Sequence, residues 1–374
     1  MTTVVESRPV KAAVVRAERG AFSIEDATIA APTGDEVLVR IVAARMCHTD
    51  MVIRDQIYPV PLPIVLGHEG SGIVEAVGKR VAGLEPGDHV VLTFDSCGFC
   101  RTCQHGVAAA CRNFNPLNFA GARNDGSHAL SFASGSVNDR FFGQSSFATY
   151  AIATARNAIK VRRDAPLELL GPLGCGIQTG AGTVLNALRV SAGSSFAAFG
   201  AGAVGLSAVM AARVAGATTI VAVDVVPERL SLALEIGATH VVDGRKEDVV
   251  EAIRALAGGG VDYAIESTAR ADVAAQAVAA LGARGTCAIV GASAPGTELV
   301  CDINDVMQNG KTIRGVVEGD SVPAFFIPQL IDLHLQGRFP FDRLTRVYAF
   351  DAINEAAADS EEGRTIKPII RMPS

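Results

Sequence analysis

Four cysteines within fifteen residues are the feature that most constrains the fold of this chain. Cys97, Cys100 and Cys103 are each separated by two residues, and Cys111 follows in the same loop. Four thiols this close together can surround one Zn²⁺ tetrahedrally. An iron–sulfur cluster is the main alternative, but ferredoxin-type runs usually carry Pro after the last cysteine, where this chain has Arg112. Coincidentally buried cysteines would follow a strand or helix period, and these do not.

Length and composition predict a compact protein of about two domains. The chain has 374 residues, 49% of them hydrophobic, with a mean hydropathy of +0.30. The net charge of −6 and the lack of a Lys/Arg run argue against a nucleic-acid partner. The first twenty residues contain no apolar core of a signal peptide, and glycines interrupt the apolar stretch 196–223. We therefore expect a cytoplasmic protein without a membrane partner, whose eight cysteines are kept reduced.

The pattern of the chain changes near residue 180. Before it, short β-rich runs separated by Pro/Gly turns predict a twisted, barrel-like antiparallel region: 12–17, 36–44, 72–77, 89–93 and 147–153. After it, six strands alternate with helices and predict a doubly wound parallel sheet: 196–199, 219–224, 240–242, 262–267, 286–290 and 312–317. Beyond residue 320 we expect a helix at 325–336 and a strand at 367–371 that rejoins the first region.

A glycine-rich turn within the second region has the context of a dinucleotide-binding fingerprint. Gly200, Gly202 and Gly205 form GxGxxG between an apolar strand and an apolar helix. The first glycine permits the turn, the second lets a pyrophosphate approach the backbone, and the third lets the helix pack on the strand. Asp224 ends the next strand, where a carboxylate binds an adenosine ribose and repels a 2′-phosphate. NAD is therefore expected rather than NADP.

A second set of metal-ligating residues is dispersed along the first region. Cys47 follows a strand, His68 follows an extended Pro-rich segment, and Cys175 lies between two glycines just before the dinucleotide region. Taken singly, each is more often an ordinary core residue. Together they form a Cys₂His set, which leaves one position open on a tetrahedral zinc and is the kind of ligand set used by catalytic zinc in alcohol dehydrogenases.

These motifs, in this order, resemble the zinc-dependent medium-chain alcohol dehydrogenases over essentially the full length of the chain. The resemblance rests on Gly67-His68-Glu69, the four-cysteine lobe, Gly174-Cys175-Gly176, the GxGxxG run and Asp224. Within the family, residues 47–50, 116–119, 141–147 and 171–180 are most similar to aryl-alcohol (benzyl alcohol) and geraniol-type dehydrogenases.

The resemblance implies three segments and two zinc ions. Residues 1–180 would form a GroES-like catalytic domain with a structural zinc lobe at 95–113, residues 181–319 an NAD-binding Rossmann domain, and residues 320–374 would complete the catalytic domain. One zinc would be held structurally by the four cysteines. The other would be catalytic, with ligands Cys47, His68 and Cys175 and with Glu69 nearby as an alternate ligand.

The resemblance also implies roles around the catalytic zinc. Thr49 would take the alcohol proton, with a role only as a helix N-cap as the less favoured alternative, and Asp50 would orient His68. Hydride would then pass from the alcohol carbon to nicotinamide, which leaves an aldehyde. Many relatives carry a histidine three residues after the hydroxyl residue to relay the proton, and this chain has Val52 there. The proton would therefore leave by another route.

Further residues are assigned by the same resemblance. His48 would face the pyrophosphate, and Lys367 would contact it too unless it is an ordinary surface lysine. The expected cofactor contacts are His48, Thr179, Gly200, Gly202, Val204, Gly205, Asp224, Arg229, Val290, Gly291 and Lys367. An apolar pocket for benzylic or allylic alcohols would be lined by Phe94, Leu117, Phe119, Phe141 and Ile177, any of which could instead be core.

Three functions are compatible with the sequence. The first is an NAD-dependent dehydrogenase that interconverts primary aromatic or allylic alcohols and aldehydes. The second is a thiol-adduct (formaldehyde-type) dehydrogenase of the same superfamily, and the third is a non-catalytic zinc- or dinucleotide-binding module. The long segment 112–146 resembles that of dimeric relatives, so we expect a homodimer joined near 286–290 and 313–317, with a homotetramer as the alternative.

Overall fold

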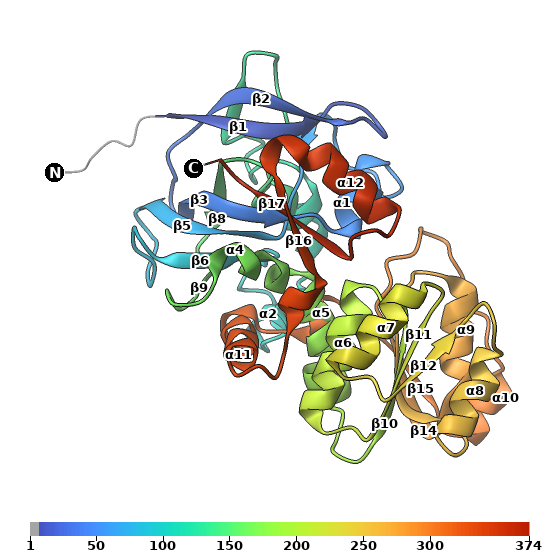
Figure 1. The fold of residues 1–374 in the computed structure, drawn as a ribbon. Coiled ribbons are helices and arrows are strands. Elements are labelled where there is room, and N and C mark those ends of the chain that lie inside the picture. The colour runs from blue at the N-terminus through green and yellow to red at the C-terminus, as the bar shows by residue number, and fades with distance from the viewer. Residues whose placement is uncertain (1–6, 374) are drawn as a thin grey trace. The chain divides into compact units, whose positions relative to one another are not determined.

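The chain folds into two compact units (Figure 1). The first comprises Met1–Cys175, Val322–Asp332 and Asp342–Ser374, and the second comprises Gly176–Ser321 and Leu333–Phe341. The computed structural model describes residues 7–373, so the outermost residues of the predicted 1–180 and 320–374 segments, 1–6 and 374, lie outside the described residues. The first unit thus combines three stretches of chain, and the second is nearly continuous in sequence.

The second unit contains the doubly wound parallel sheet that the sequence predicts. Its strand order is β12-β11-β10-β13-β14-β15, and every pairing is parallel. The order reverses between β10 and β13, and ligands bind at the carboxyl ends of strands beside such a reversal. The strands are β10 (Ser195–Phe199), β11 (Thr219–Asp224), β12 (His240–Asp243), β13 (Val261–Glu266), β14 (Leu281–Ile289) and β15 (Thr312–Gly315).

Helices cover both faces of this sheet. In Figure 1, α6 and α7 lie on one side of it, and α8 and α9 lie on the other. The inner strands β10 and β11 are almost wholly apolar and buried, as expected for parallel strands covered on both faces. The helices of this unit are α5 (Gly176–Gly182), α6 (Ala203–Ala215), α7 (Pro227–Ile236), α8 (Val249–Leu256), α9 (Ala271–Ala279) and α10 (Ile303–Gln308).

The first unit is built from two sheets that are mostly antiparallel. One has the order β4-β1-β2-β7, and the other has the order β16-β17-β3-β5-β6-β9, with β8 also paired to β3. The first sheet contains β1 (Arg8–Val15), β2 (Phe22–Ile29), β4 (Ile64–Val65) and β7 (Leu130–Phe132). The second contains β3 (Glu36–Arg45), β5 (Gly70–Val77), β6 (His89–Leu92), β8 (Tyr150–Thr154), β9 (Ala158–Lys160), β16 (Thr345–Ala349) and β17 (Lys367–Arg371).

The C-terminal strand rejoins the first unit as predicted. β17 pairs antiparallel with β3, with Ile369 opposite Arg45. Around the sheets lie α1 (His48–Arg54), α2 (Arg101–Gln104), α3 (Phe114–Phe119), α4 (Leu167–Leu170), α11 (Pro323–Leu335) and α12 (Ile353–Glu361), of which α11 starts in this unit. Among the helices of residues 7–373, none is both long and apolar enough to cross a membrane. β17 therefore brings residues from the end of the chain next to those that follow β3.

Candidate active site

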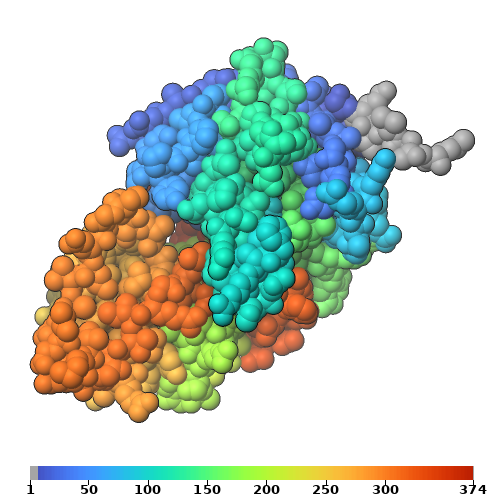
Figure 2. Space-filling model, turned by 180° about the vertical axis from the view of Figure 1, so that it is seen from behind, coloured from blue at the N-terminus to red at the C-terminus, as the bar shows by residue number. Residues whose placement is uncertain are grey.

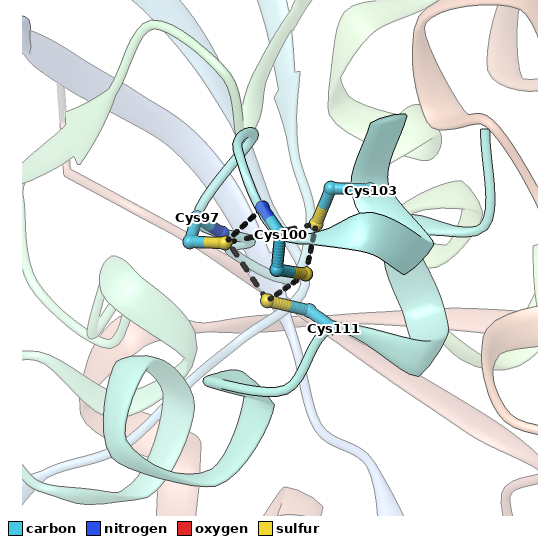
Figure 3. A group of neighbouring side chains, drawn as sticks. All are labelled: Cys97, Cys100, Cys103 and Cys111. Atoms are coloured by element: carbon cyan, nitrogen blue, oxygen red, sulfur yellow. Dashed lines mark hydrogen bonds between the residues drawn. The ribbon is translucent and has the colours of Figure 1, made fainter. Parts of the chain in front are cut away.

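The four cysteines of the lobe converge on one point (Figure 3). The Sγ atoms of Cys100 and Cys103 lie 3.5 Å apart, those of Cys97 and Cys103 3.9 Å apart, and those of Cys100 and Cys111 4.0 Å apart. A tetrahedral zinc with Zn–S bonds of about 2.3 Å separates its sulfurs by about 3.8 Å. The spacing therefore fits zinc held by four protein ligands, which leaves no position for a substrate.

Backbone amides support the sulfurs of this lobe. The amide of Cys100 donates to Cys97 Sγ at 3.3 Å, and the amides of Cys97 and Asn113 donate to Cys111 Sγ at 3.3 and 3.4 Å. The Thr102 hydroxyl and neighbouring backbone amides lower the pKa of the Cys100 thiol to about 5. Figure 2 shows the lobe, in cyan to teal, on the molecular surface. Local donors thus stabilise the thiolate form of Cys100, whereas burial raises the pKa of Cys103 and Cys111.

The dispersed set also converges, and all of it belongs to the first unit. Ligand atoms of Cys47, His68, Glu69 and Cys175 lie within 4.8 Å of one another. Cys47 is the N-cap residue of α1, and His68 and Glu69 directly precede β5. Cys175 follows a short 3-10 turn (η3, Gly171–Gly174), which the Thr93 hydroxyl fixes by donating to the Gly174 carbonyl at 2.6 Å. The fold thus gathers residues that are separated by more than a hundred positions.

Asp50 links three parts of this cluster. Its Oδ1 accepts from the Gly67 amide at 3.0 Å and contacts His68 Nδ1 at 3.1 Å, and its Oδ2 accepts from the Cys47 amide at 2.8 Å. Asp50 is fully buried. The contact expected from the sequence is therefore present, and it turns Nδ1 of His68 towards the carboxylate and away from the sulfurs.

The charges of the cluster favour a bound cation. The hydrogen bond with Cys175 and the nearby Lys367 and His68 hold the pKa of Cys47 well below its usual range, against the effect of burial. Burial opposes a charge on His68, but Asp50 and Cys47 raise its pKa well above the usual value. Each group thus stabilises the charged form of its neighbours, and a metal ion would supply the same positive charge.

The orphaned atom of His68 shows that a metal fits here. Its Nε2 is buried without a hydrogen-bond partner among residues 7–373, although buried polar atoms are nearly always satisfied. The sulfurs of Cys47 and Cys175, a carboxylate oxygen of Glu69 and a ring nitrogen of His68 all lie within 4.8 Å of one another. Cys47, His68 and Cys175 therefore provide three ligands of the types that Zn²⁺ prefers, with Glu69 within reach as a fourth.

Two basic residues flank Glu69, and one of them was missed by the sequence analysis. Lys367 Nζ donates to both carboxylate oxygens of Glu69, at 2.9 and 3.1 Å, and is only 3% exposed. Arg45 Nη1 lies 3.8 Å from Glu69 Oε2. Burial lowers the pKa of Arg45 to about 9, although Glu69, Cys47 and Cys175 oppose that shift. No signal in the sequence distinguishes Arg45 from an ordinary residue at the end of a strand.

Aromatic rings surround His68. Phe142 stacks on its ring at a centroid distance of 4.4 Å, and Phe141 meets its edge at 5.2 Å. Phe119 contacts both phenylalanines, and Phe114 connects Phe142 to Phe94. Phe142, which the sequence analysis missed, has φ 50° within the 3-10 turn Phe141–Gly143 (η2). A bulky residue rarely adopts that region, so the stacking is fixed by a strained backbone.

Leu117 and Ile177, the other two residues of the predicted pocket, belong to different units. Leu117 lines a 300 Å³ cavity beside the cysteine lobe, together with Cys97, Phe99 and Arg156. Ile177 is buried in α5 of the second unit, where its carbonyl accepts from the Ser207 hydroxyl at 2.7 Å. Phe94, Phe119 and Phe141 thus share the aromatic group at His68, and the pocket roles of all five residues stay predictions.

The second unit has the geometry of a dinucleotide site. Gly200 has φ +95°, and a Cβ on Gly205 would lie 1.7 Å from the Gly200 carbonyl oxygen, whereas a Cβ on Gly202 would meet nothing within 4 Å. Asp224 accepts from the amides of Ala201 (2.6 Å), Val225 (2.7 Å) and Val226. A 380 Å³ cavity is lined by Gly200, Gly202, Asp224 and Arg229, among others. Open space at the middle glycine and a fixed carboxylate fit an adenosine diphosphate.

The other predicted cofactor contacts are distributed over both units. Val204 is the second residue of α6, and the amides of Val290 and Gly291 donate to the Glu266 carbonyl at 2.9 and 3.1 Å. The Thr179 hydroxyl donates to Glu318 at 3.3 Å in the second unit. In the first unit, His48 is exposed at the start of α1, whereas Lys367 is buried on Glu69. The cofactor roles of all of these residues stay predictions.

Comparison with known proteins decides the family. Residues 33–163 match the alcohol dehydrogenase GroES-like domain, and residues 203–333 match the zinc-binding dehydrogenase domain. This chain belongs to the zinc-dependent alcohol dehydrogenases. It is 49% identical over 362 residues to a geraniol dehydrogenase of Castellaniella defragrans. This match covers 96% of this chain and 97% of that protein.

Two solved structures share the whole fold. An alcohol dehydrogenase zinc-binding domain protein from Burkholderia ambifaria has a TM-score of 0.98 and 62% identity, covering 99% of this chain and 100% of its own. Benzyl alcohol dehydrogenase from Acinetobacter calcoaceticus has a TM-score of 0.96 and 54% identity, covering 98% and 100%. The predicted combination of a GroES-like domain with a Rossmann-like domain is therefore confirmed, as is the predicted likeness to aryl-alcohol and geraniol dehydrogenases.

Proposed function

We propose that this enzyme oxidises primary aromatic or allylic alcohols to aldehydes with NAD, and catalyses the reverse reaction. The observation that carries the substrate class is the aromatic group around His68, in which Phe142 stacks on the imidazole and Phe141 meets its edge. Flat, apolar alcohols gain more from contact with such rings than ethanol does. The names of the two relatives, a geraniol and a benzyl alcohol dehydrogenase, point in the same direction.

The protein residues prepare the alcohol for loss of its proton and hydride. When bound by Cys47, His68 and Cys175, zinc acts as a Lewis acid that polarises an alcohol oxygen. Asp50 keeps the His68 ring oriented, so that Nε2 presents its lone pair to the metal position. We assign proton transfer to Thr49, whose Oγ1 lies 3.7 Å from Cys47 Sγ; its hydroxyl would take the alcohol proton as it passes its own proton on.

Cofactor choice would depend on Asp224. Three backbone amides hold its carboxylate at the end of β11, where it lines the cavity beside Gly202. A fixed carboxylate accepts hydrogen bonds from a ribose and repels the 2′-phosphate of NADP. We assign the pyrophosphate to the N-terminus of α6.

The proposal includes two zinc ions per chain, a homodimer and a cytoplasmic location. One zinc is assigned to the lobe and one to the Cys47 site. β15 ends the six-stranded sheet, and all four of its residues are exposed, including the apolar Ile313. A free, partly apolar sheet edge is suited to pairing with a second copy. None of the eight cysteines, all of which lie within residues 7–373, forms a disulfide, which agrees with a reducing compartment.

A substrate panel tests the proposed function. Initial rates of NADH formation are measured for benzyl alcohol, geraniol, ethanol and cyclohexanol, with NADP replacing NAD in parallel assays. We expect the highest kcat/KM for benzyl alcohol or geraniol with NAD. A preference for ethanol or cyclohexanol would refute the substrate class, and a preference for NADP would refute the role of Asp224. Activity that requires an added thiol would indicate the thiol-adduct dehydrogenase instead.

A further inference from the structure

Arg45 is a buried cation with unsatisfied donors beside the predicted catalytic zinc site. The residue has no exposed surface, and Nε, Nη1 and Nη2 all lack a hydrogen-bond partner among residues 7–373. Its nearest carboxylate oxygen is Glu69 Oε2, 3.8 Å from Nη1. A buried guanidinium without hydrogen bonds is strongly unfavourable unless nearby anions compensate for lost hydration. Its position next to Glu69 therefore requires an explanation.

The backbone fixes Arg45 at this place. It is the last residue of β3, its amide donates to the Glu69 carbonyl at 3.0 Å, and it pairs with Ile369 of β17. Lys367, at the start of the same strand β17, reaches the Glu69 carboxylate from the chain's far end. The pairing of β3 with β17 thus places two cations, Arg45 and Lys367, beside the buried Glu69 carboxylate.

Glu69 has two alternative partners. Its carboxylate is bound by Lys367, yet it also lies within 4.8 Å of the ligand atoms of Cys47, His68 and Cys175. If it bound zinc together with these three residues, the tetrahedral shell would be complete and no position would remain for another ligand. The balance of charges around Glu69 must therefore favour either its contact with the cations or its binding to the metal.

The charges of the site indicate which of these two arrangements of Glu69 is favoured. Two thiolates, Asp50 and Glu69 carry four negative charges, while a divalent metal and Lys367 carry three positive charges. Arg45 supplies the fourth, so that the buried site is neutral only when Arg45 is present. Without it, the excess negative charge would favour closer contact between Glu69 and the metal.

We propose that Arg45 is a positioning residue which, together with Lys367, holds the Glu69 carboxylate off the catalytic zinc and so keeps one coordination position open. The inference rests on the proposed function only in that Cys47, His68 and Cys175 bind zinc. It goes further because it names the residue that controls access to the metal. It also accounts for the 3.8 Å separation: the guanidinium attracts the carboxylate without being its hydrogen-bond partner.

The test compares Arg45→Met with Arg45→Lys, and uses Arg40→Met as a matched control. Arg40 lies on the same strand but pairs with Glu75 at the surface, at 2.9 Å. Each protein is loaded with Co²⁺, whose visible absorption bands report the coordination shell, and the zinc form is challenged with a chelator. The four-cysteine site contributes equally to every variant, so differences between variants report the site at Cys47.

In Arg45→Met, we expect shifted Co²⁺ bands, slower release of the less tightly held zinc, and a KM for alcohol raised roughly tenfold. Arg45→Lys and Arg40→Met should behave like the wild type. Adding Glu69→Gln to Arg45→Met should restore both the bands and the release rate, because the competing carboxylate is gone. A purely structural Arg45 would instead give faster zinc loss that Glu69→Gln does not reverse, and this outcome would overturn the proposal.

Glu69→Gln alone provides an independent test that does not require an Arg45 variant to fold. Because the two cations already hold the carboxylate away, this change should leave the Co²⁺ bands of the otherwise wild-type protein nearly unaltered. A large shift would show that Glu69 is a ligand even with Arg45 present and would refute the proposal. The Co²⁺ bands and the rate of zinc release are measured without turnover. Inactivity towards all four alcohols would therefore reject the proposed function, while the test of Arg45 would remain valid.

Discussion

Replacing Asp50 by Asn is the most informative single change at the Cys47 site. The carboxylate accepts from two backbone amides and faces His68 Nδ1, at 2.8–3.1 Å. Asparagine has one oxygen and one NH₂ group, so it cannot satisfy both sides. If its oxygen stays with Gly67 and His68, its NH₂ faces the Cys47 amide, and a buried N–H loses its acceptor.

The opposite orientation of Asn is worse for metal binding. Its NH₂ would then donate to Nδ1 of His68, which moves the imidazole proton to Nε2, the atom that must be free for zinc. A buried unsatisfied donor costs about 1–3 kcal/mol. Loss of a carboxylate that orients a metal-bound histidine typically costs about 10–100-fold in metal affinity. We therefore expect both effects in Asp50→Asn.

The assay is a zinc competition titration with a chelator, combined with urea unfolding of the same samples. Asp55→Asn is a suitable control, because Asp55 lies at the other end of α1 and pairs with Arg54 near the surface. Asp50→Asn should weaken one zinc site at least tenfold, while the control changes it little. A zinc affinity for Asp50→Asn within twofold of wild type would refute the role of Asp50.

Three further predictions concern the lobe, the cofactor and acid stability. Cys111→Ser should lower zinc content from two ions per chain to one and lower the Tm, as checked by metal analysis and calorimetry; unchanged zinc content would exclude the lobe as a site. Asp224→Ala should reduce the preference for NAD over NADP in kcat/KM by about 10–100-fold, because charge-assisted hydrogen bonds contribute about 1.5–3 kcal/mol. Despite burial, Arg123 lowers the pKa of Glu36 below its usual value, so this pair stabilises the protein above the unfolded-state pKa and the stabilisation is lost as pH falls through the folded-state pKa. Arg123→Met should therefore weaken the dependence of unfolding free energy on pH below about pH 5, and an unaltered pH profile would contradict this.

The sequence was sufficient for features that depend on local spacing. The four lobe cysteines lie within fifteen residues, so the loop can bring them together without long-range contacts. The six parallel strands were found because short strand-like runs alternate with helical segments along the chain. By contrast, β2 was not predicted, since half of its sequence FSIEDATI is polar and half is exposed, and the strand is fixed by pairing along the whole of β1.

The parts of the site that were missed depend on long-range packing. Lys367 and Glu69 are 298 positions apart, and only the pairing of β17 with β3 makes their contact possible. Arg45 follows an apolar strand and looks like its solvent-facing end, yet it is fully buried. Phe142 stacks on His68 only because its backbone adopts φ 50°, which no residue pattern indicates.

The most direct test of the account is the initial rate of NADH formation from benzyl alcohol and NAD by wild-type protein and by Cys47→Ser. A serine hydroxyl is a poor zinc ligand compared with a thiolate, while the four lobe cysteines are unaffected. We predict NADH formation by the wild type and none above background by Cys47→Ser, with the variant still folded and holding one zinc. A folded Cys47→Ser variant with wild-type activity would contradict the assignment of catalysis to this site.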